Sequence, residues 1–229
     1  MSEISQATAW SVRAAQDRHS LHEQYREHAQ QRESAKLGMW VFLATEVMFF
    51  GGMILGYIAY RDAYPAAFRA GSVHMLFMAG TLNTAILISA SLFVAFAVHA
   101  AQTGERKALV WFLSIAMFLG IVFLSIKGYE YYEHWVDHKV PGPSFQWDGP
   151  DPRHAEMFFV LYFFLTGFHA LHMIIGVSIL AFIVYFAAHG RYTPEYHNPV
   201  ENAALYWHFV DIVWIFLYPM LYLIGHTHV

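Results

Sequence analysis

Five apolar segments, each long enough to cross a membrane as a helix, dominate this sequence. They lie at about residues 37–60, 75–101, 108–129, 156–188 and 203–225. A helix crosses the hydrocarbon core of about 30 Å with roughly 20 residues, so each segment is sufficient. Charged residues make up only 13% of the chain, against about a quarter in soluble domains. The sequence therefore predicts an all-α integral membrane protein, a bundle of five transmembrane helices.

The chain divides into a polar N-terminal segment and a membrane domain. Residues 1–35 mix charges of both signs and contain no Gly or Pro, which favours a helix outside the membrane, while residues 36–229 hold the five spans. The stretch 133–155 is rich in Pro, Gly and Asp and is predicted to be an ordered coil. No short apolar segment with a small-residue cleavage site precedes residue 36, so we expect the first span to direct insertion.

The positive charges favour one orientation in the membrane. With the N-terminus in the cytoplasm, eight of the 13 Lys and Arg residues lie on the cytoplasmic side and five, Lys127 among them, on the other. Cytoplasmic loops carry an excess of Lys and Arg. We therefore predict a multi-pass protein of the cell inner (plasma) membrane, with a cytoplasmic N-terminus and the C-terminus outside.

Composition excludes several functional classes. The chain has no cysteine, so disulfides, thiol catalysis and Cys-ligated metal clusters are ruled out. A net charge of −4 without a basic patch argues against nucleic acid. We find no nucleophile with a neighbouring base, no phosphate-binding loop and no paired carboxylates, and so predict no catalytic residue.

Ionisable side chains inside the spans are the candidate functional residues. Each costs roughly 2.5–3.5 kcal/mol near the centre of a helix on insertion scales, and such residues are functional hypotheses by default. They are Glu46, His99, His169, His172, His208 and Asp211. His208 and Asp211 are three apart and share a helix face, so they are expected to pair. Glu46 must then find a partner across a helix interface, either His172 or His169. Each residue taken alone is also explained by a polar contact that holds helices in register.

A metal or haem site is an alternative interpretation of the histidines. Two His three apart, as in "HALH", could bind zinc together with a third ligand, and haem needs an axial His from each of two helices. The spacing of His169 and His172 is a weak signal, and the Glu that usually stands between paired zinc-binding His is missing. We therefore predict no metal and no cofactor in this chain.

Packing and interfacial signals complete the pattern. Gly52 and Gly56 are four apart, a spacing that allows close helix approach. Asn83 and Thr84 are expected to form interhelical hydrogen bonds, and Glu130 is expected to reach the membrane interface. Aromatic residues near span ends are predicted to anchor the interfaces; they include Trp40, Tyr57, Tyr60, Trp111, Tyr129, Tyr131, Tyr132 and Tyr222.

Four motifs, in order, resemble subunit III of the haem–copper terminal oxidases, the cytochrome c oxidase family. They are "ATEVMFFGG" at 44–52, "LNTAILISAS" at 82–91, "TGFHALHMIIG" at 166–176 and "YWHFVDIVWIFLYPMLYLIG" at 206–225, supported by "GYEYYE" at 128–133. The resemblance runs from about Lys36 to the C-terminus. Family members have seven or, in many bacteria, five transmembrane helices, and this chain resembles the five-helix form.

The resemblance implies a subunit without redox centres in a proton-pumping oxidase of aerobic respiratory electron transport. Haems and copper are expected in partner subunits. This chain would pack mainly on subunit I, with subunit II and small subunits as further partners. It would bind structural phospholipid and support proton uptake and sustained turnover.

The resemblance also assigns residues. The family's intramembrane acid falls on Glu46, its paired imidazoles on His169 and His172, and its Trp-His-Phe-Val-Asp segment on Trp207 to Asp211. Phe42 would line the lipid cleft together with Glu46, and Arg191 is a looser candidate for contact with a lipid phosphate. On this resemblance Glu46 is expected to hydrogen-bond His172, with His208 as the next candidate.

Other functions remain open at this point. The same scaffold could serve a quinol oxidase or act as an accessory subunit of a nitric oxide reductase, because subunit II sets the electron donor. A free-standing proton transporter would use Glu46, the His residues and Asp211 as a relay. A di-haem membrane anchor would bind haem itself.

Overall fold

The computed structural model describes residues 28–149, 151–194 and 196–225, and within them the chain is almost entirely helical. The elements are α2 (His28–Ala63), α3 (Pro65–Val73), α4 (Phe77–Thr103), α5 (Arg106–Val136), α6 (Pro152–Ala188), α7 (Asn198–Tyr218) and a π-helical turn η1 (Pro219–Leu223). Five helices are long and apolar enough to cross a membrane, with η1 extending the last. The predicted all-α class and the five spans are confirmed. Most of residues 1–35 lies outside the described residues.

The described helices α2, α5 and α6 are longer than the predicted spans, and α7 begins five residues earlier than predicted. α5 continues to Val136, seven residues beyond the predicted end of its span at 129. α6 has 37 residues, which corresponds to about 55 Å of helix and exceeds the thickness of the hydrocarbon core. The extension of α5 places Lys127 and Glu130 inside a helix rather than at its end.

The chain forms two units, Met1–Phe42 and Leu43–Val229, and α2 runs through the boundary between them. The described part of the first unit is the helical start of α2. Its side chains are largely exposed, and they include Leu37, Trp40 and Val41. The second unit contains every other helix and all of the contacts described below.

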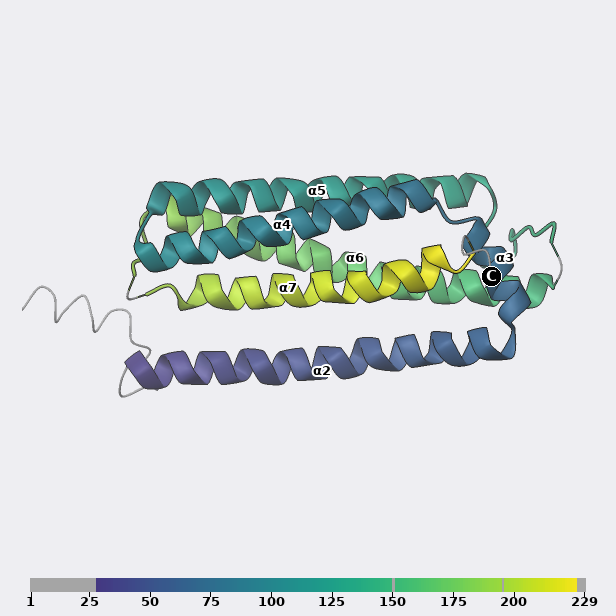
Figure 1. Ribbon diagram of the computed structural model, residues 1–229, viewed down its shortest axis with the longest axis horizontal. Helices are drawn as coiled ribbons and strands as arrows, with labels where there is room; N and C mark the ends of the chain where they lie inside the picture. The colour runs from purple at the N-terminus through teal and green to yellow at the C-terminus, as the bar shows by residue number, and fades with distance from the viewer. Residues whose placement is uncertain (1–27, 150, 195, 226–229) are drawn as a thin grey trace, which may run out of the picture. The chain divides into compact units, whose positions relative to one another are not determined.

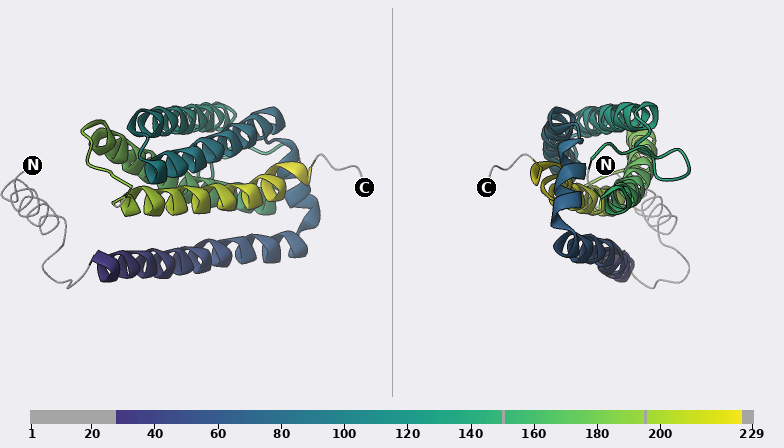
Figure 2. Two further views of the ribbon diagram at one scale, coloured as in Figure 1. Left: turned by 60° about the vertical axis from the view of Figure 1, so that its left-hand side comes forward. Right: turned by 90° about the vertical axis from the view of Figure 1, so that its right-hand side faces the viewer.

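Within the second unit, α4, α5, α6 and α7 form a four-helix bundle. α4 packs on α5, α5 on α6, α6 on α7 and α7 on α4, which closes a ring that is visible end-on in Figure 2 and from the side in Figure 1. Its interior holds large side chains such as Trp207, Trp214, Phe123 and Leu113. Glycine allows the closest approach at Gly120, where a Cβ would lie 2.7 Å from the Trp207 ring.

Two of the predicted packing contacts differ from expectation. Thr84 accepts a hydrogen bond from the indole of Trp214 at 3.1 Å, which confirms an α4–α7 contact. Asn83 is fully buried, but neither of its amide atoms has a hydrogen-bond partner among the described residues. A Cβ on Gly52 or Gly56 would meet no atom within 4 Å among the described residues. The glycine spacing in α2 therefore does not mark a helix contact inside this unit.

A short helix, α3, and the π-helical turn η1 meet at the end of the bundle. α3 was not predicted; it begins with Pro65 at a position that suits proline. Pro219, which has no backbone N–H, stands at the start of η1. The carbonyl of Leu221 accepts a hydrogen bond from Ser72 Oγ at 2.7 Å, and the carbonyl of Met220 accepts one from Tyr57 at 2.9 Å. η1 therefore ties α2 and α3 to the C-terminal end of α7.

Candidate functional site

The acid in the first span is paired with an imidazole of α6. Nε2 of His172 lies 3.0 Å from Oε2 of Glu46, and the two side chains are only 12% and 17% exposed. Both residues lie near the middle of their spans, Glu33–Ala63 and Pro152–Ala188. The predicted partner of Glu46 is therefore His172, not His169.

The protons of this pair can be assigned from its hydrogen bonds. Nδ1 of His172 lies 2.8 Å from the carbonyl oxygen of Phe168, and a carbonyl can only accept, so Nδ1 carries the hydrogen. If the ring is neutral, Nε2 is an acceptor and Glu46 must be protonated to donate. If the ring is charged, it donates to a carboxylate. In both arrangements the pair holds one shared proton and has no net charge.

Aromatic side chains enclose the pair. The ring of Phe50 packs against the imidazole of His172 at 5.1 Å and against Phe209 at 6.3 Å, and Phe49 packs against Phe168 at 5.1 Å. Tyr206 donates its hydroxyl to the carbonyl of His172 at 3.0 Å. These contacts join the part of α2 from Leu43 onwards to α6 and α7, so the pair lies at a helix interface.

His169, one turn before His172, has a different environment. It is fully buried, and in the part of the chain that the structure describes neither ring nitrogen has a hydrogen-bond partner. Its ring lies 5.1 Å from that of Trp214 and 5.6 Å from that of Phe123. In this structure His169 is an aromatic component of the bundle interior, and it takes no part in the Glu46 pair.

His208 and Asp211 are linked through a serine of α4 rather than directly. Ser91 Oγ lies 2.9 Å from Nδ1 of His208 and donates to Oδ2 of Asp211 in a short contact. All three residues lie near the middle of α4 or α7. The direct pairing expected from their spacing is therefore wrong, and the three side chains hold α4 and α7 together.

The sequence analysis missed a fourth polar cluster, which lies around Lys127. The ammonium group donates to Glu130 Oε2 at 3.0 Å, to the Tyr162 hydroxyl at 3.1 Å and to the Tyr222 hydroxyl at 2.8 Å. Both tyrosine hydroxyls donate onward to Glu130 Oε1, at 2.8 Å and 2.6 Å. Every hydrogen of the ammonium group is thus used. We name Lys127, Glu130, Tyr162 and Tyr222 the lysine cluster; it joins α5, α6 and η1.

Several residues that were predicted to lie at the membrane interface are buried inside the protein. Glu130 was expected to reach the interface and Tyr222 to belong to the aromatic girdle, but both are 0% exposed, and Lys127 is 2% exposed. Tyr57, also assigned to the girdle, is 0% exposed. The available signal was the spacing of Lys127 and Glu130, three apart, which places them on one helix face. Trp40, Tyr60, Trp111, Tyr129 and Tyr132 are exposed as predicted.

The two further lipid candidates lie at separate places. Arg191, just beyond α6, is exposed, and its guanidinium group stacks on the Phe186 ring at 4.7 Å. Phe42 belongs to the first unit and is 39% exposed. The guanidinium group lies beside Phe186, which follows His172 by 14 residues of α6, or about 21 Å of helix rise, so Arg191 does not contact the acid–imidazole pair.

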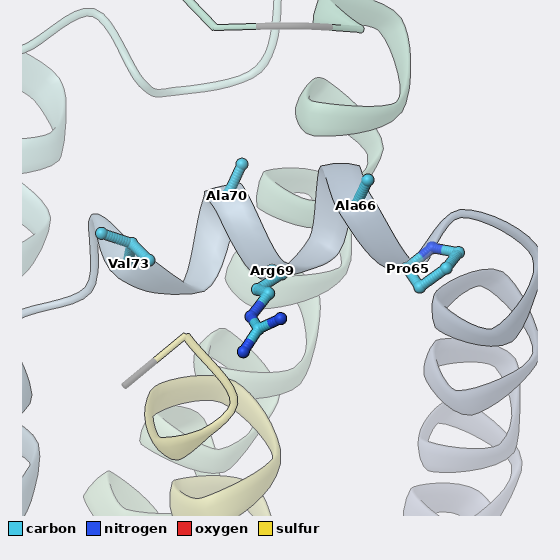
Figure 3. Close-up of a pocket in the computed structure, with 5 residues that line it drawn as sticks. All are labelled: Pro65, Ala66, Arg69, Ala70 and Val73. Atoms are coloured by element: carbon cyan, nitrogen blue, oxygen red, sulfur yellow. The ribbon is translucent and has the colours of Figure 1, made fainter. Parts of the chain in front are cut away.

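A shallow pocket of about 490 Å³ lies elsewhere, on the outer face of α3. Its lining residues are Pro65, Ala66, Arg69, Ala70 and Val73, drawn in Figure 3. It contains none of the predicted site residues. Within residues 28–149, 151–194 and 196–225, no group of three or more His, Asp or Glu side chains is arranged to hold a metal ion.

Comparison with known proteins identifies the family. A family model described as cytochrome c oxidase subunit III matches residues 4–226. The cytochrome c oxidase subunit 3 of Oncorhynchus mykiss is 34% identical over 197 residues, which cover 83% of this chain and 70% of the relative. That of Salmo salar is 34% identical over 199 residues and that of Gadus morhua 32% over 197, with the same coverage. With five membrane-spanning helices and this match over nearly its whole length, the chain belongs to the cytochrome c oxidase subunit III family.

Proposed function

We propose that this chain is a non-catalytic subunit of a proton-pumping haem–copper cytochrome c oxidase in the cell inner membrane. In this role it packs mainly on subunit I, holds structural phospholipid, and supports proton uptake and sustained turnover. Family membership supports a place in an oxidase complex. In this proposal the chain contributes helices, interhelical hydrogen bonds and lipid contacts. The haems and copper belong to partner subunits.

The observation that carries the proposal is the Glu46–His172 hydrogen bond of 3.0 Å between α2 and α6. Both ring nitrogens of His172 are engaged, Nε2 with Glu46 and Nδ1 as the donor to the carbonyl of Phe168. The imidazole therefore has no lone pair free to bind a metal or a haem iron. They hold α2 beside the bundle, which is a structural role.

The exposed apolar side of α2 supports the proposal that the chain binds phospholipid. Val47, Met48 and Leu55 of α2 are 58%, 80% and 67% exposed, while Phe49 and Phe50 make the inward contacts. Arg191 suits a lipid phosphate, because a guanidinium group binds phosphate through paired donors. A phosphate at Arg191 would bring acyl chains, rather than the headgroup, to the depth of Glu46, because His172, the partner of Glu46, lies about 21 Å along α6 from the Phe186 ring on which Arg191 stacks. Phe42 and Glu46 are accordingly proposed as acyl-chain contacts.

The charge distribution supports a cytoplasmic N-terminus. Lys127 was counted with the outer loops, but it is buried inside α5. Without it, the outer side retains Arg61, Arg69, Lys139 and Arg153 against eight positive residues on the cytoplasmic side. The bias expected for membrane proteins is therefore stronger than in the sequence count.

Purification of the assembled complex tests the proposal. An affinity tag on this chain should recover haem absorbance and copper from membranes in mild detergent, together with oxidation of reduced cytochrome c. The chain expressed alone should show no haem absorbance. Recovery of the chain without any haem protein would contradict the proposal. Turnover with quinol in place of cytochrome c would assign the same scaffold to a quinol oxidase.

A further inference from the structure

The polar cluster of Ser91, His208 and Asp211 reaches the outer surface of the bundle, as the Glu46–His172 pair also does. It differs from that pair because one ring nitrogen of its histidine has no hydrogen-bond partner among the described residues. Asp211 is 5% exposed, but Ser91 and His208 are partly exposed in the seam between α4 and α7. His208 lies ten residues into the span Asn198–Leu223 and Ser91 fourteen into Phe77–Thr103. The cluster therefore lies near mid-depth in the membrane.

The hydrogen bonds of the cluster show which ring nitrogen of His208 is still an acceptor without a donor in the described part of the chain. Ser91 donates its only hydrogen to Asp211 Oδ2, so the contact of 2.9 Å between Ser91 Oγ and His208 Nδ1 requires Nδ1 to be the donor. A neutral imidazole that carries its hydrogen on Nδ1 has a lone pair on Nε2. No described residue hydrogen-bonds to Nε2 of His208, and this atom is not enclosed.

Lipid cannot satisfy that atom at this depth. The surrounding side chains on the same surface are apolar and open: Ile88 is 55% exposed and Leu92 53% on α4, and Ile212 is 51% exposed and Ile215 48% on α7. Hydrocarbon supplies no hydrogen-bond donor, and water is scarce in the bilayer core. Polar side chains in spans pair with one another across helices instead.

We propose that the α4–α7 seam around His208 is a docking surface for a transmembrane helix of a partner subunit. That helix carries a hydrogen-bond donor at mid-depth, a hydroxyl, amide, indole or cationic group, which faces Nε2 of His208. Ile88, Leu92, Ile212 and Ile215 supply the apolar contact on either side of the donor. The inference rests on the proposed function, since it requires a multi-subunit complex.

Two amide variants distinguish a hydrogen bond of His208 Nε2 to a partner helix from the internal hydrogen bond of Nδ1 to Ser91. In His208→Asn the amide replaces Nδ1 and still reaches Ser91, but nothing stands at Nε2. In His208→Gln the amide oxygen replaces Nε2, while the contact with Ser91 is lost. Retention of the chain on haem-containing subunits is measured through a detergent wash. We expect His208→Asn and His208→Leu to lose retention by about fivefold and His208→Gln to keep it. The reverse order, with Asn retained and Gln lost, would overturn the proposal.

Photocrosslinking in the intact complex locates the partner directly. A benzoylphenylalanine at Ile212 should capture a transmembrane peptide of another subunit that contains a donor side chain. The same probe at Phe118, which is 62% exposed on α5 across the bundle, is the matched control for capture that depends only on exposure. Capture of lipid alone at Ile212, in a complex that does contain haem subunits, overturns this inference and leaves the proposed function standing. Purification of the chain with no partner overturns both.

Discussion

The hydroxyl of Tyr222, in the last turn of the chain that the structure describes, donates to Glu130 Oε1 at 2.6 Å across 92 residues of sequence. The same hydroxyl accepts a hydrogen from Lys127 at 2.8 Å. One phenol thus closes the lysine cluster and attaches η1 to α5. The conformation of the C-terminal end depends on an ion pair that lies in a different helix.

Removing that hydroxyl should loosen the C-terminal end without unfolding the bundle. Tyr222→Phe keeps the ring but leaves Lys127 short of an acceptor and Glu130 short of a donor. We expect a loss of about 1–3 kcal/mol in the free energy of unfolding, the usual penalty for a buried polar group left without its partner. Unfolding of the purified complex in mixed detergent micelles measures it. Tyr218→Phe is the control, because its bond to Thr81 is exposed; an equal loss in both variants would contradict the prediction.

Breaking the Lys127–Glu130 pair should cost more than breaking any single neutral bond. Lys127→Met leaves a buried carboxylate uncompensated, and such changes destabilise by about 3–5 kcal/mol. The double variant Lys127→Met with Glu130→Gln removes both charges and should recover part of that loss. A double-mutant cycle on unfolding free energies measures the coupling. Additive effects would show that the two charges do not interact in the protein.

At Glu46, the shape of the side chain should matter less than its ability to donate. Glu46→Gln offers an amide N–H to Nε2 of His172 and should keep assembly and bound lipid near the level of the unmodified chain. Glu46→Leu removes the hydrogen bond and should reduce the share of chain recovered in the complex by about threefold to tenfold, the range for an interhelical hydrogen bond of about 0.6–1.4 kcal/mol.

Subunit recovery and phospholipid content of the purified complex, with turnover followed over successive cycles, measure both Glu46 variants. If Glu46→Gln behaves like Glu46→Leu, the ionised pair is the functional form. If neither variant differs from the unmodified chain, the pair has no role in assembly.

Glycine positions give a test of packing alone. In Gly120→Ala the new Cβ would lie 2.7 Å from Trp207 and 3.0 Å from Val177, and overpacking of this kind costs about 1–3 kcal/mol. In Gly56→Ala the new Cβ meets no described atom within 4 Å, so the chain alone should gain about 0.5–1 kcal/mol from reduced backbone entropy. Unfolding of the isolated chain compares them. A loss at Gly56 that appears only in the assembled complex would mark that face as a partner contact.

The sequence predicted the features that depend on local hydropathy and missed those that depend on distant partners. All five spans were recognised because runs of apolar residues of sufficient length have few other uses. Lys127 and Glu130 were assigned to a helix end because charges normally terminate a span. Their hydrogen-bond partners, Tyr162 and Tyr222, are 35 and 95 residues from Lys127, and no local pattern connects them.

For the polar residues inside the spans, too, the local sequence predicted some features, while others depended on residues far away in the chain. Glu46 was expected to pair with His172, with His208 as the next candidate, and the bond to His172 is confirmed. The spacing alone left His169 open as well, because the choice depends on the rotation of two helices about their axes. The spacing of His208 and Asp211 correctly placed them on one face, but Ser91 of α4 lies between them and takes both contacts. α3 was missed because nine residues with one proline at the start resemble a loop.

The hydrogen bond from His172 to the carbonyl of Phe168 determines how strongly transmembrane voltage acts on the Glu46–His172 pair. By holding a hydrogen on Nδ1, it leaves Glu46 and the imidazole with a single mobile proton between two atoms 3.0 Å apart. Transfer of that proton moves one charge by less than this distance, which is about a tenth of the hydrocarbon thickness, and so changes its energy by less than about 0.2 kcal/mol per 100 mV of transmembrane voltage. The pair is therefore nearly insensitive to the voltage that an energised membrane maintains, and α2 stays attached whether the membrane is charged or discharged.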